Sequence, residues 1–307
     1  METLRFGDYP LSRMMLGTVQ FGMSYGIANR SGQPQYADIV RMLAVAAEAG
    51  VNCLDTAAAY GESEEVLGKA MAELGIANHM FVATKVIALP DELSMSEADA
   101  KIEESVVQSL RKLRLHCLPM CLFHRERNCV YMDSLLRLKD KGLVHHVGTS
   151  ICETPEETKQ LWTPSLLDGI QIPASVLDRR FEKAGIVATM ASKGGAVFTR
   201  STYLQGLLLL SDDDTPSALA VVNPVRARLK ELARETGITL AELALRFMLG
   251  RSGISSVIVG VETLEQLQSN LSLFENGPLD SDLSARVEAT VTELSNDVLM
   301  PNKWPSR

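Results

Sequence analysis

The chain has 307 residues, a hydrophobic fraction of 46% and a formal net charge of −8 at pH 7. This length allows either two ordinary domains or one large α/β barrel with a substantial core. The excess of acidic residues argues against a general nucleic-acid binder, but it permits a local basic pocket for an anionic cofactor.

Hydropathy and cysteine content indicate a soluble intracellular protein. No apolar stretch approaches the roughly 20 residues of a membrane span, and the N-terminus lacks the apolar run of a signal peptide. Five cysteines without a C-x-x-C pair do not suggest a disulfide framework or a zinc site. We therefore expect a cytoplasmic protein without a bound metal.

Short apolar runs alternate with amphipathic stretches along the chain. The runs predict eight strands at Met14–Gly17, Val51–Asp55, Phe81–Val86, Leu118–Phe123, Val144–Thr149, Gly169–Ile172, Ala196–Thr199 and Ser256–Val259. Between them, helices are predicted over Tyr36–Ala49, Ser63–Leu74, Ser96–Leu113 and Ser134–Lys141, with another starting at Thr154-Pro155. Fully apolar strands indicate a parallel sheet that is covered on its outside.

Eight such units favour a closed (β/α)8 TIM barrel of the α/β class over an open sheet. No G-x-G-x-x-G follows the first strand, so the usual indication of a Rossmann domain is missing. We expect an acidic rim loop at Ser211–Asn223, an extra C-terminal helix near Ser281–Leu294 and an irregular end from Met300 to Pro305. Because no linker or change of composition divides the chain, residues 1–307 are predicted to form one barrel domain.

Polar side chains follow three successive strands where apolar packing does not require them: Asp55 and Tyr60, then Lys85, then His124. A barrel brings the carboxyl ends of its strands to one rim. A buried Lys beside an Asp is expected to depress the pKa of Tyr60. Tyr60 could then protonate a carbonyl oxygen while His124 holds that oxygen. Hydride must come from elsewhere, which implies nicotinamide.

Four motifs occur in register: Leu16-Gly17-Thr18-Val19-Gln20-Phe21-Gly22, Leu54-Asp55-Thr56-Ala57-x-x-Tyr60-Gly61, Thr84-Lys85-Val86 and Phe123-His124. In order and spacing they resemble the signatures of the aldo-keto reductase superfamily, over about residues 11–271. The resemblance implies that Tyr60 is the general acid, that Lys85 and Asp55 tune it and that His124 orients the carbonyl.

The same resemblance implies a nucleotide site around the later strand ends. Arg200 stands where many relatives have a Tyr that stacks on nicotinamide, and a planar guanidinium can stack on an aromatic face or pair with phosphate. Gln266 stands where a basic selector of NADPH is usual, and Glu262 adds negative charge nearby. NADP(H) is favoured on family grounds, with NAD(H) as the alternative. The expected cofactor residues are Thr18, Ser150, Gln171, Arg200, Ser201, Gln205, Gly260, Thr263, Gln266 and Asn270.

Substrate specificity is expected to lie in loops. The candidate substrate residues are Gln20, Phe21, Tyr25 and Arg125, together with the polar segment Met23–Arg30. With 5% aromatic residues, a small polar carbonyl such as a sugar suits the chain better than a steroid. We predict an NAD(P)H-dependent reductase of an aldehyde or ketone.

Two other functions stay open. One is a nicotinamide-binding regulatory or sensing module with little turnover, which would not need all four of Asp55, Tyr60, Lys85 and His124. The other is a lyase or isomerase that uses Lys85 as a Schiff-base amine.

Overall fold

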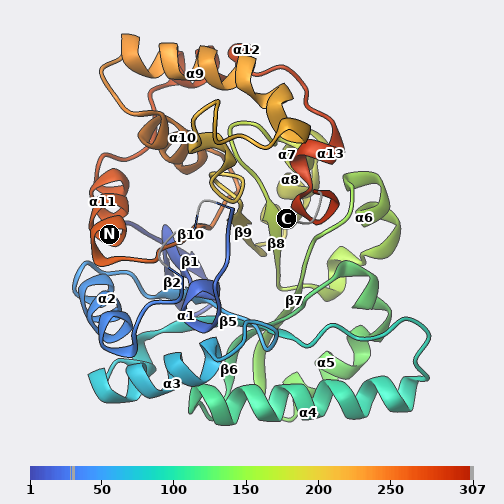
Figure 1. The fold of residues 1–307 in the computed structure, drawn as a ribbon. Helices are drawn as coiled ribbons and strands as arrows, with labels where there is room; N and C mark the ends of the chain where they lie inside the picture. The colour runs from blue at the N-terminus through green and yellow to red at the C-terminus, as the bar shows by residue number, and fades with distance from the viewer. Residues whose placement is uncertain (28, 30–31, 305–307) are drawn as a thin grey trace.

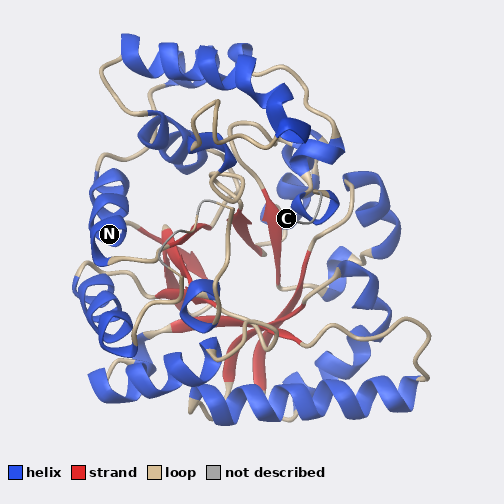
Figure 2. Cartoon of the chain, in the orientation of Figure 1, coloured by secondary structure: helices blue, strands red, loops and turns tan. Residues whose placement is uncertain are grey.

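A computed structural model of the chain describes residues 1–27, 29 and 32–304. Its centre is a closed barrel of parallel strands in the order β10-β3-β4-β5-β6-β7-β8-β9, with helices around the outside (Figures 1 and 2). This confirms the predicted (β/α)8 barrel. The barrel strands are β3 (Met14–Gly17), β4 (Cys53–Asp55), β5 (Phe81–Val86), β6 (Leu118–Phe123), β7 (Val144–Ser150), β8 (Gly169–Pro173), β9 (Ala196–Arg200) and β10 (Ser256–Gly260).

The helices begin and end close to the predicted residues. On α2 the buried face consists of Ile39, Met42, Leu43 and Ala46, as the spacing predicts. Thr154 caps α6 by accepting from the Glu157 N–H. The helices are α1 (Val19–Gly22), α2 (Tyr36–Glu48), α3 (Ser63–Leu74), α4 (Met95–Leu113), α5 (Met132–Asp140), α6 (Pro155–Leu161), α7 (Arg180–Lys183), α8 (Ile186–Ala191), α9 (Asn223–Glu235), α10 (Leu240–Leu249), α11 (Leu264–Glu275), α12 (Ser281–Thr290) and α13 (Asn296–Leu299).

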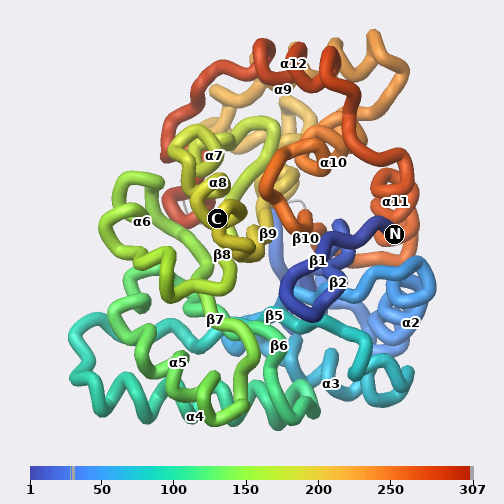
Figure 3. Tube along the Cα trace, turned by 180° about the vertical axis from the view of Figure 1, so that it is seen from behind, coloured from blue at the N-terminus to red at the C-terminus, as the bar shows by residue number. Residues whose placement is uncertain are grey.

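An N-terminal hairpin that the sequence analysis missed closes one end of the barrel. It consists of β1 (Thr3–Phe6) and β2 (Tyr9–Ser12), and Figure 3 shows it lying across the barrel opening. Phe6 packs edge-on against Phe81 of β5, with ring centroids 6.1 Å apart. The hairpin therefore plugs the end of the barrel at which the strands begin, which leaves the opposite end for a ligand.

Some predicted boundaries were wrong for identifiable reasons. The strand predicted from Val51 begins at Cys53, because the Asn52 side chain accepts from the Ser12 N–H at 2.9 Å and supports the hairpin instead. The predicted loop at 211–223 contains a 3-10 helix, Ser217–Val222, that leads directly into α9. The predicted helix at 281–294 ends at Thr290.

The chain end also differs from the predicted irregular segment at 300–305. A 3-10 helix spans Pro301–Lys303, and Pro305 lies outside the described residues. Among the described residues, none of the helices is both long and apolar enough to cross a membrane.

Candidate active site

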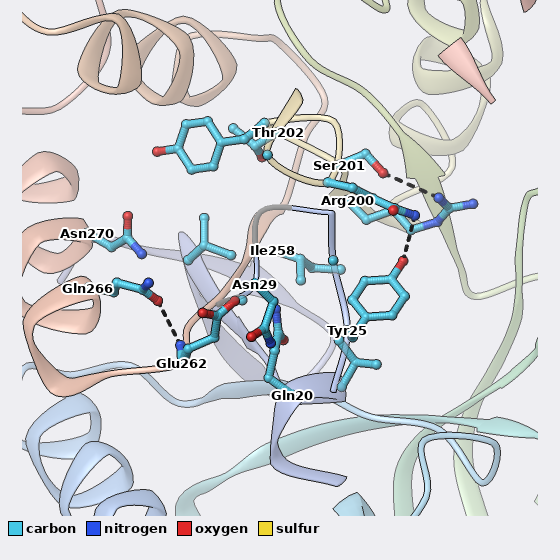
Figure 4. Close-up of a pocket in the computed structure, with 18 of the residues that line it drawn as sticks. Gln20, Tyr25, Asn29, Arg200, Ser201, Thr202, Ile258, Glu262, Gln266 and Asn270 are labelled. Carbon is cyan, nitrogen blue, oxygen red and sulfur yellow. Dashed lines mark hydrogen bonds between the residues drawn. The ribbon is translucent and has the colours of Figure 1, made fainter. Parts of the chain in front are cut away.

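A cavity of about 600 Å³ opens at the carboxyl ends of the barrel strands. It is elongated: Figure 4 shows Arg200, Ser201 and Tyr25 on one side and Glu262, Gln266 and Asn270 on the other. Tyr60 and Asp55 also line it. Its volume lies in the range of small-molecule and cofactor sites, roughly 300–1,000 Å³.

A buried ion pair stands at the cavity wall where β4 and β5 end. Lys85 Nζ donates to Asp55 Oδ1 at 2.6 Å and to the Thr56 carbonyl at 2.9 Å. Gln171 Nε2, from β8, donates to the same Asp55 oxygen at 2.6 Å. Because Lys85 and Asp55 are both buried, each charge depends on the other for compensation.

Tyr60 lies next to this pair. The Lys85 Nζ is 4.9 Å from the centroid of the Tyr60 ring. Burial raises the pKa of Tyr60, while the positive charges of Lys85 and Arg200 act in the opposite direction. The net direction is upward, so the predicted depression of this pKa was wrong: the loss of hydration outweighs the field of Lys85. The phenol therefore keeps its proton at neutral pH.

His124 faces Tyr60 from the end of β6. The two rings meet edge to face, with centroids 5.8 Å apart. Burial lowers the pKa of His124 to about 4, and the charges of Lys85, Arg200 and Arg125 add to the effect. Its imidazole is neutral at pH 7 and can donate one N–H without carrying a charge.

Two glycines let the chain bring Tyr60 to the rim. Gly61 has φ +55°, and a Cβ there would lie 2.3 Å from the Gly22 carbonyl oxygen. In the reverse direction, a Cβ on Gly22 would lie 1.9 Å from the Tyr60 carbonyl oxygen. Only glycine allows this backbone approach, so the Tyr60-Gly61 turn is fixed against α1.

The structure brings six of the ten predicted cofactor residues to the cavity: Arg200, Ser201, Gln205, Gly260, Gln266 and Asn270. Ser201 and Gln205 both have positive φ, at +68° and +53°, in the turn after β9. Non-glycine residues in this conformation are uncommon and often mark functional loops.

The other four predicted cofactor residues do not line the cavity. Thr18 donates to the Asp55 carbonyl at 2.8 Å. Thr263 caps α11 by accepting from the Gln266 N–H. Ser150 donates to Gln171 Oε1 at 3.4 Å, so these two buried side chains support the Asp55–Lys85 pair.

Two of the four predicted substrate residues line the cavity. They are Gln20 and Tyr25, whose hydroxyl accepts from Gln205 Nε2 at 3.1 Å. Phe21 is fully buried in the core, so its side chain is not available to a ligand. Arg125 is exposed at the rim and is not among the lining residues. Of the predicted polar segment 23–30, residues 28 and 30 lie outside the described residues.

Helix α11 contributes lining residues that the sequence analysis missed. Glu265, Ser269 and Leu273 face the cavity beside Gln266 and Asn270. Their spacing of three to four residues follows one face of a helix, and this periodicity could have identified them.

Fold and cavity together define a (β/α)8-barrel protein whose ligand site lies at the carboxyl ends of the strands. Residues 13–292 match the Aldo/keto reductase family, and the chain belongs to that family. The resemblance seen in its motifs is thereby confirmed. Members of the family are oxidoreductases that use nicotinamide cofactors.

Curated relatives match most of the chain at low identity. An aldo-keto reductase of Strobilurus tenacellus is 24% identical, covering 97% of this chain and 94% of its own length. An L-glyceraldehyde 3-phosphate reductase of Escherichia coli O157:H7 is 24% identical, with 88% and 89% covered. A probable voltage-gated potassium channel subunit beta of Arabidopsis thaliana is 25% identical, with 90% and 93% covered.

The same fold recurs among solved structures. The holo form of an aldo-keto reductase from Bacillus halodurans superposes with a TM-score of 0.75 at 22% identity. The match covers 97% of this chain and 99% of that one.

Proposed function

We propose that this protein reduces an aldehyde or ketone to an alcohol with NAD(P)H and that Tyr60 is the general acid. The observation that carries the proposal is the contact among Asp55, Lys85 and Tyr60 at the cavity wall, with the ammonium over the phenol ring. A barrel that only had to bind a nucleotide would not need a buried ion pair beside a tyrosine.

The cavity suits a dinucleotide. Gln20 Oε1 and Thr202 Oγ1 are buried without a hydrogen-bond partner in the described part of the chain, and both residues line the cavity. At the far end, the partial positive charge of the α11 N-terminus favours an anion, although Thr263 already accepts from the Gln266 N–H. We propose that Ser201, Gln205, Gly260, Gln266 and Asn270 hold the cofactor, whereas Arg200 lies across the cavity from Gln266 and Asn270 and is left to the substrate. When bound, reduced nicotinamide supplies a hydride for the carbonyl carbon.

The protein's own groups would handle the proton and the carbonyl oxygen. Tyr60 keeps its proton at neutral pH and gives it to the oxygen as negative charge develops there. Lys85, held by Asp55, supplies a positive field that favours this transfer. Neutral His124 donates a hydrogen bond to the same oxygen, while Ser150 and Gln171 keep the ion pair in place.

Charges at the far end of the cavity bear on the choice of nucleotide. The family resemblance favours NADP(H), but the lining there includes the carboxylates of Glu262 and Glu265. The Glu262 main-chain N–H donates to Gln266 Oε1 at 2.8 Å, which ties the two residues together. A carboxylate accepts hydrogen bonds from a ribose diol and repels a 2′-phosphate. We therefore propose NAD(H) as the preferred cofactor, with NADP(H) as the alternative.

A small polar carbonyl compound, sugar-like in character, is the proposed substrate, and the cytoplasm is the proposed location. Polar side chains of Gln20, Tyr25 and Ser201 line the cavity. One relative is named for the reduction of a three-carbon sugar phosphate, which is in keeping with this substrate class.

Two other functions compete with this one. One relative is named as a channel subunit and not for a reaction, so a nicotinamide-binding module with little turnover is the second candidate. A Schiff-base role for Lys85 is disfavoured: burial lowers its pKa, but Asp55 and Tyr60 raise it further, so the net direction is upward. A protonated amine is not a nucleophile.

The experiment is to follow the absorbance of NADH and NADPH with a reactive aromatic aldehyde, for wild type and Tyr60→Phe in parallel. We expect turnover by wild type and a loss of about 10²–10⁴-fold in the variant, which is the range of general acid catalysis. Nucleotide affinity should stay unchanged. Tight nucleotide binding without oxidation by wild type would favour the binding module.

A further inference from the structure

Arg200 presents a cation to the cavity that no carboxylate in the described part of the chain pairs with. Its NH2 group donates to the Ile151 carbonyl at 2.8 Å and approaches Cys152 Sγ at 3.8 Å. Its NH1 group reaches Ser201 Oγ at 3.5 Å. These acceptors are neutral and leave part of the five-donor guanidinium unused.

Two arginines around this end of the cavity have no carboxylate partner in the described part of the chain. Lys85 is neutralised by Asp55, whereas Arg200 and Arg125 form no ion pair within the described ranges. The positive charges of both arginines help to lower the pKa of His124. The buried carboxylate of Glu126 is already engaged by the main-chain N–H groups of Cys152 and Glu153.

A half-buried cation without a counter-charge is costly unless a ligand supplies that charge. We propose that the substrate is an anionic carbonyl compound and that Arg200 binds its carboxylate or phosphate while Tyr60 faces its carbonyl. This inference rests on the proposed function and narrows its substrate class. Arg125, exposed at the rim, adds attraction for the incoming anion.

The position of Arg200 favours substrate over cofactor as its partner. It lies across the cavity from Glu262, Gln266 and Asn270, where the partial positive charge of the α11 N-terminus favours a phosphate (Figure 4). Contact with nicotinamide would bring a guanidinium against a ring that is itself positively charged when oxidised. An anionic group on the substrate can reach Arg200 at this end of the cavity, and it is attracted by the guanidinium and not repelled.

The reaction is otherwise that of the proposed function. The carbonyl carbon gains a hydride and the oxygen gains the Tyr60 proton, so the anionic group is left unchanged by the reaction. Arg200 then acts through binding and orientation, and its loss should appear mainly in KM.

The test compares anionic and neutral carbonyl compounds of matched shape, with nucleotide at saturation. The pairs are succinic semialdehyde with its methyl ester, and glyceraldehyde 3-phosphate with glyceraldehyde. The pair with the larger preference for its anionic member shows whether Arg200 binds a carboxylate or a phosphate. The variants are Arg200→Gln, Arg200→Lys and the control Arg228→Gln, which removes the same charge from the exposed surface of α9. Nucleotide affinity is measured by calorimetry on every variant.

We expect wild type to prefer an anionic member by about 10- to 100-fold in kcat/KM, the range of a charge-assisted hydrogen bond. Arg200→Gln should abolish the preference through KM, Arg200→Lys should retain part of it, and Arg228→Gln should match wild type. Nucleotide affinity should change less than about threefold, which is well under 1 kcal/mol. The proposal is overturned if Arg200→Gln prefers the anionic compounds as strongly as wild type does. So does a tenfold loss of nucleotide affinity with the preference unchanged, which would make Arg200 a cofactor residue.

A second measurement covers the case of no turnover. Calorimetric titration of the nucleotide-loaded protein with succinate and with inorganic phosphate should show binding that Arg200→Gln removes. Absence of binding to wild type contradicts the anion site. Binding without any turnover contradicts the reductase function and leaves the anion site standing.

Discussion

The Asp55–Lys85 pair shows how individual residues build the site. Asp55 is the last residue of β4 and Lys85 the last but one of β5, and the register pairs Asp55 with Ala83, so Lys85 lies two residues further along its strand and on the same face as Ala83. Removing one partner would leave a buried charge uncompensated, which typically costs about 3–5 kcal/mol. The pair is therefore structural as well as functional. For that reason Tyr60, rather than Asp55 or Lys85, is the better residue for testing the chemistry.

His124 makes stability depend on pH. Its pKa is about 4 in the folded protein, against about 6.5 in an unfolded chain. Between these values the unfolded state binds more protons, so stability is full above pH 6.5 and falls as the pH drops toward 4. From pH 7 to pH 5, wild type should lose about 1–2 kcal/mol more than His124→Gln. Urea denaturation at both pH values measures this, and an equal loss in both proteins would contradict it.

Glu262 should govern the choice of nucleotide. Calorimetry on wild type should show NADH binding at least about tenfold more tightly than NADPH, because the carboxylate repels a 2′-phosphate. Glu262→Gln should narrow the difference by improving the affinity for NADPH. The control Glu275→Gln removes the same charge from the exposed end of α11 and should change nothing. Tighter binding of NADPH by wild type would reverse the proposal.

Site residues were easiest to predict from the sequence where a polar or charged side chain stands at the end of an otherwise apolar strand. Asp55, Lys85 and His124 follow apolar strands, so their positions alone pointed to a rim. Phe21 was misjudged because the residue type does not say whether a side chain points into the core or into a cavity. Predicting the direction in which the pKa of Tyr60 shifts requires its degree of burial, and the spacing of residues in the sequence does not reveal burial.

At the level of elements, the contact of α1 with the start of α3 sets the position of Tyr60. Gly61→Ala would introduce a Cβ 2.3 Å from a main-chain oxygen, in addition to the cost of positive φ. Gly75→Ala is the matched control, since Gly75 has φ +68° with nothing within 4 Å of its added Cβ. Gly75→Ala should cost about 1–2 kcal/mol, and Gly61→Ala should cost clearly more. Denaturation midpoints compare the two, and equal losses would remove the packing explanation.

The barrel strands were predictable because most of their residues are apolar or small and buried on both faces, with the exposed His145 of β7 as an exception. The β1–β2 hairpin was missed although Thr3–Phe6 alternates polar and apolar residues and Gly7-Asp8 suits a two-residue turn, because each strand has only four residues and only Phe6 of β1 is buried. Its role as a plug depends on contacts with β5 and β7 that are distant in sequence. The 3-10 helix at Ser217–Val222 and the start of α9 were likewise obscured by the acidic residues at 212–214.

At the scale of the whole molecule, we propose that the chain is one domain. The barrel closes only when β10 pairs with β3 and β9, which joins residues from both ends of the chain. The alternation of apolar runs and amphipathic helices predicted eight strand–helix units, but it could not demonstrate that the strands close into a barrel. Near-ultraviolet and far-ultraviolet circular dichroism should therefore give the same unfolding midpoint, and two separate midpoints would argue for two units.

The molecule carries a net charge of −8, yet Arg200, which forms no ion pair in the described part of the chain, lines one end of its cavity. The central claim is that hydride passes from reduced nicotinamide to a carbonyl carbon at that end. The most direct measurement incubates the protein with nicotinamide cofactor deuterated at C4 and with a carbonyl substrate, followed by mass spectrometry of the alcohol. We predict one deuterium on the carbinol carbon with wild type and almost none with Tyr60→Phe. Formation of the alcohol without deuterium from either face of the ring would contradict the account.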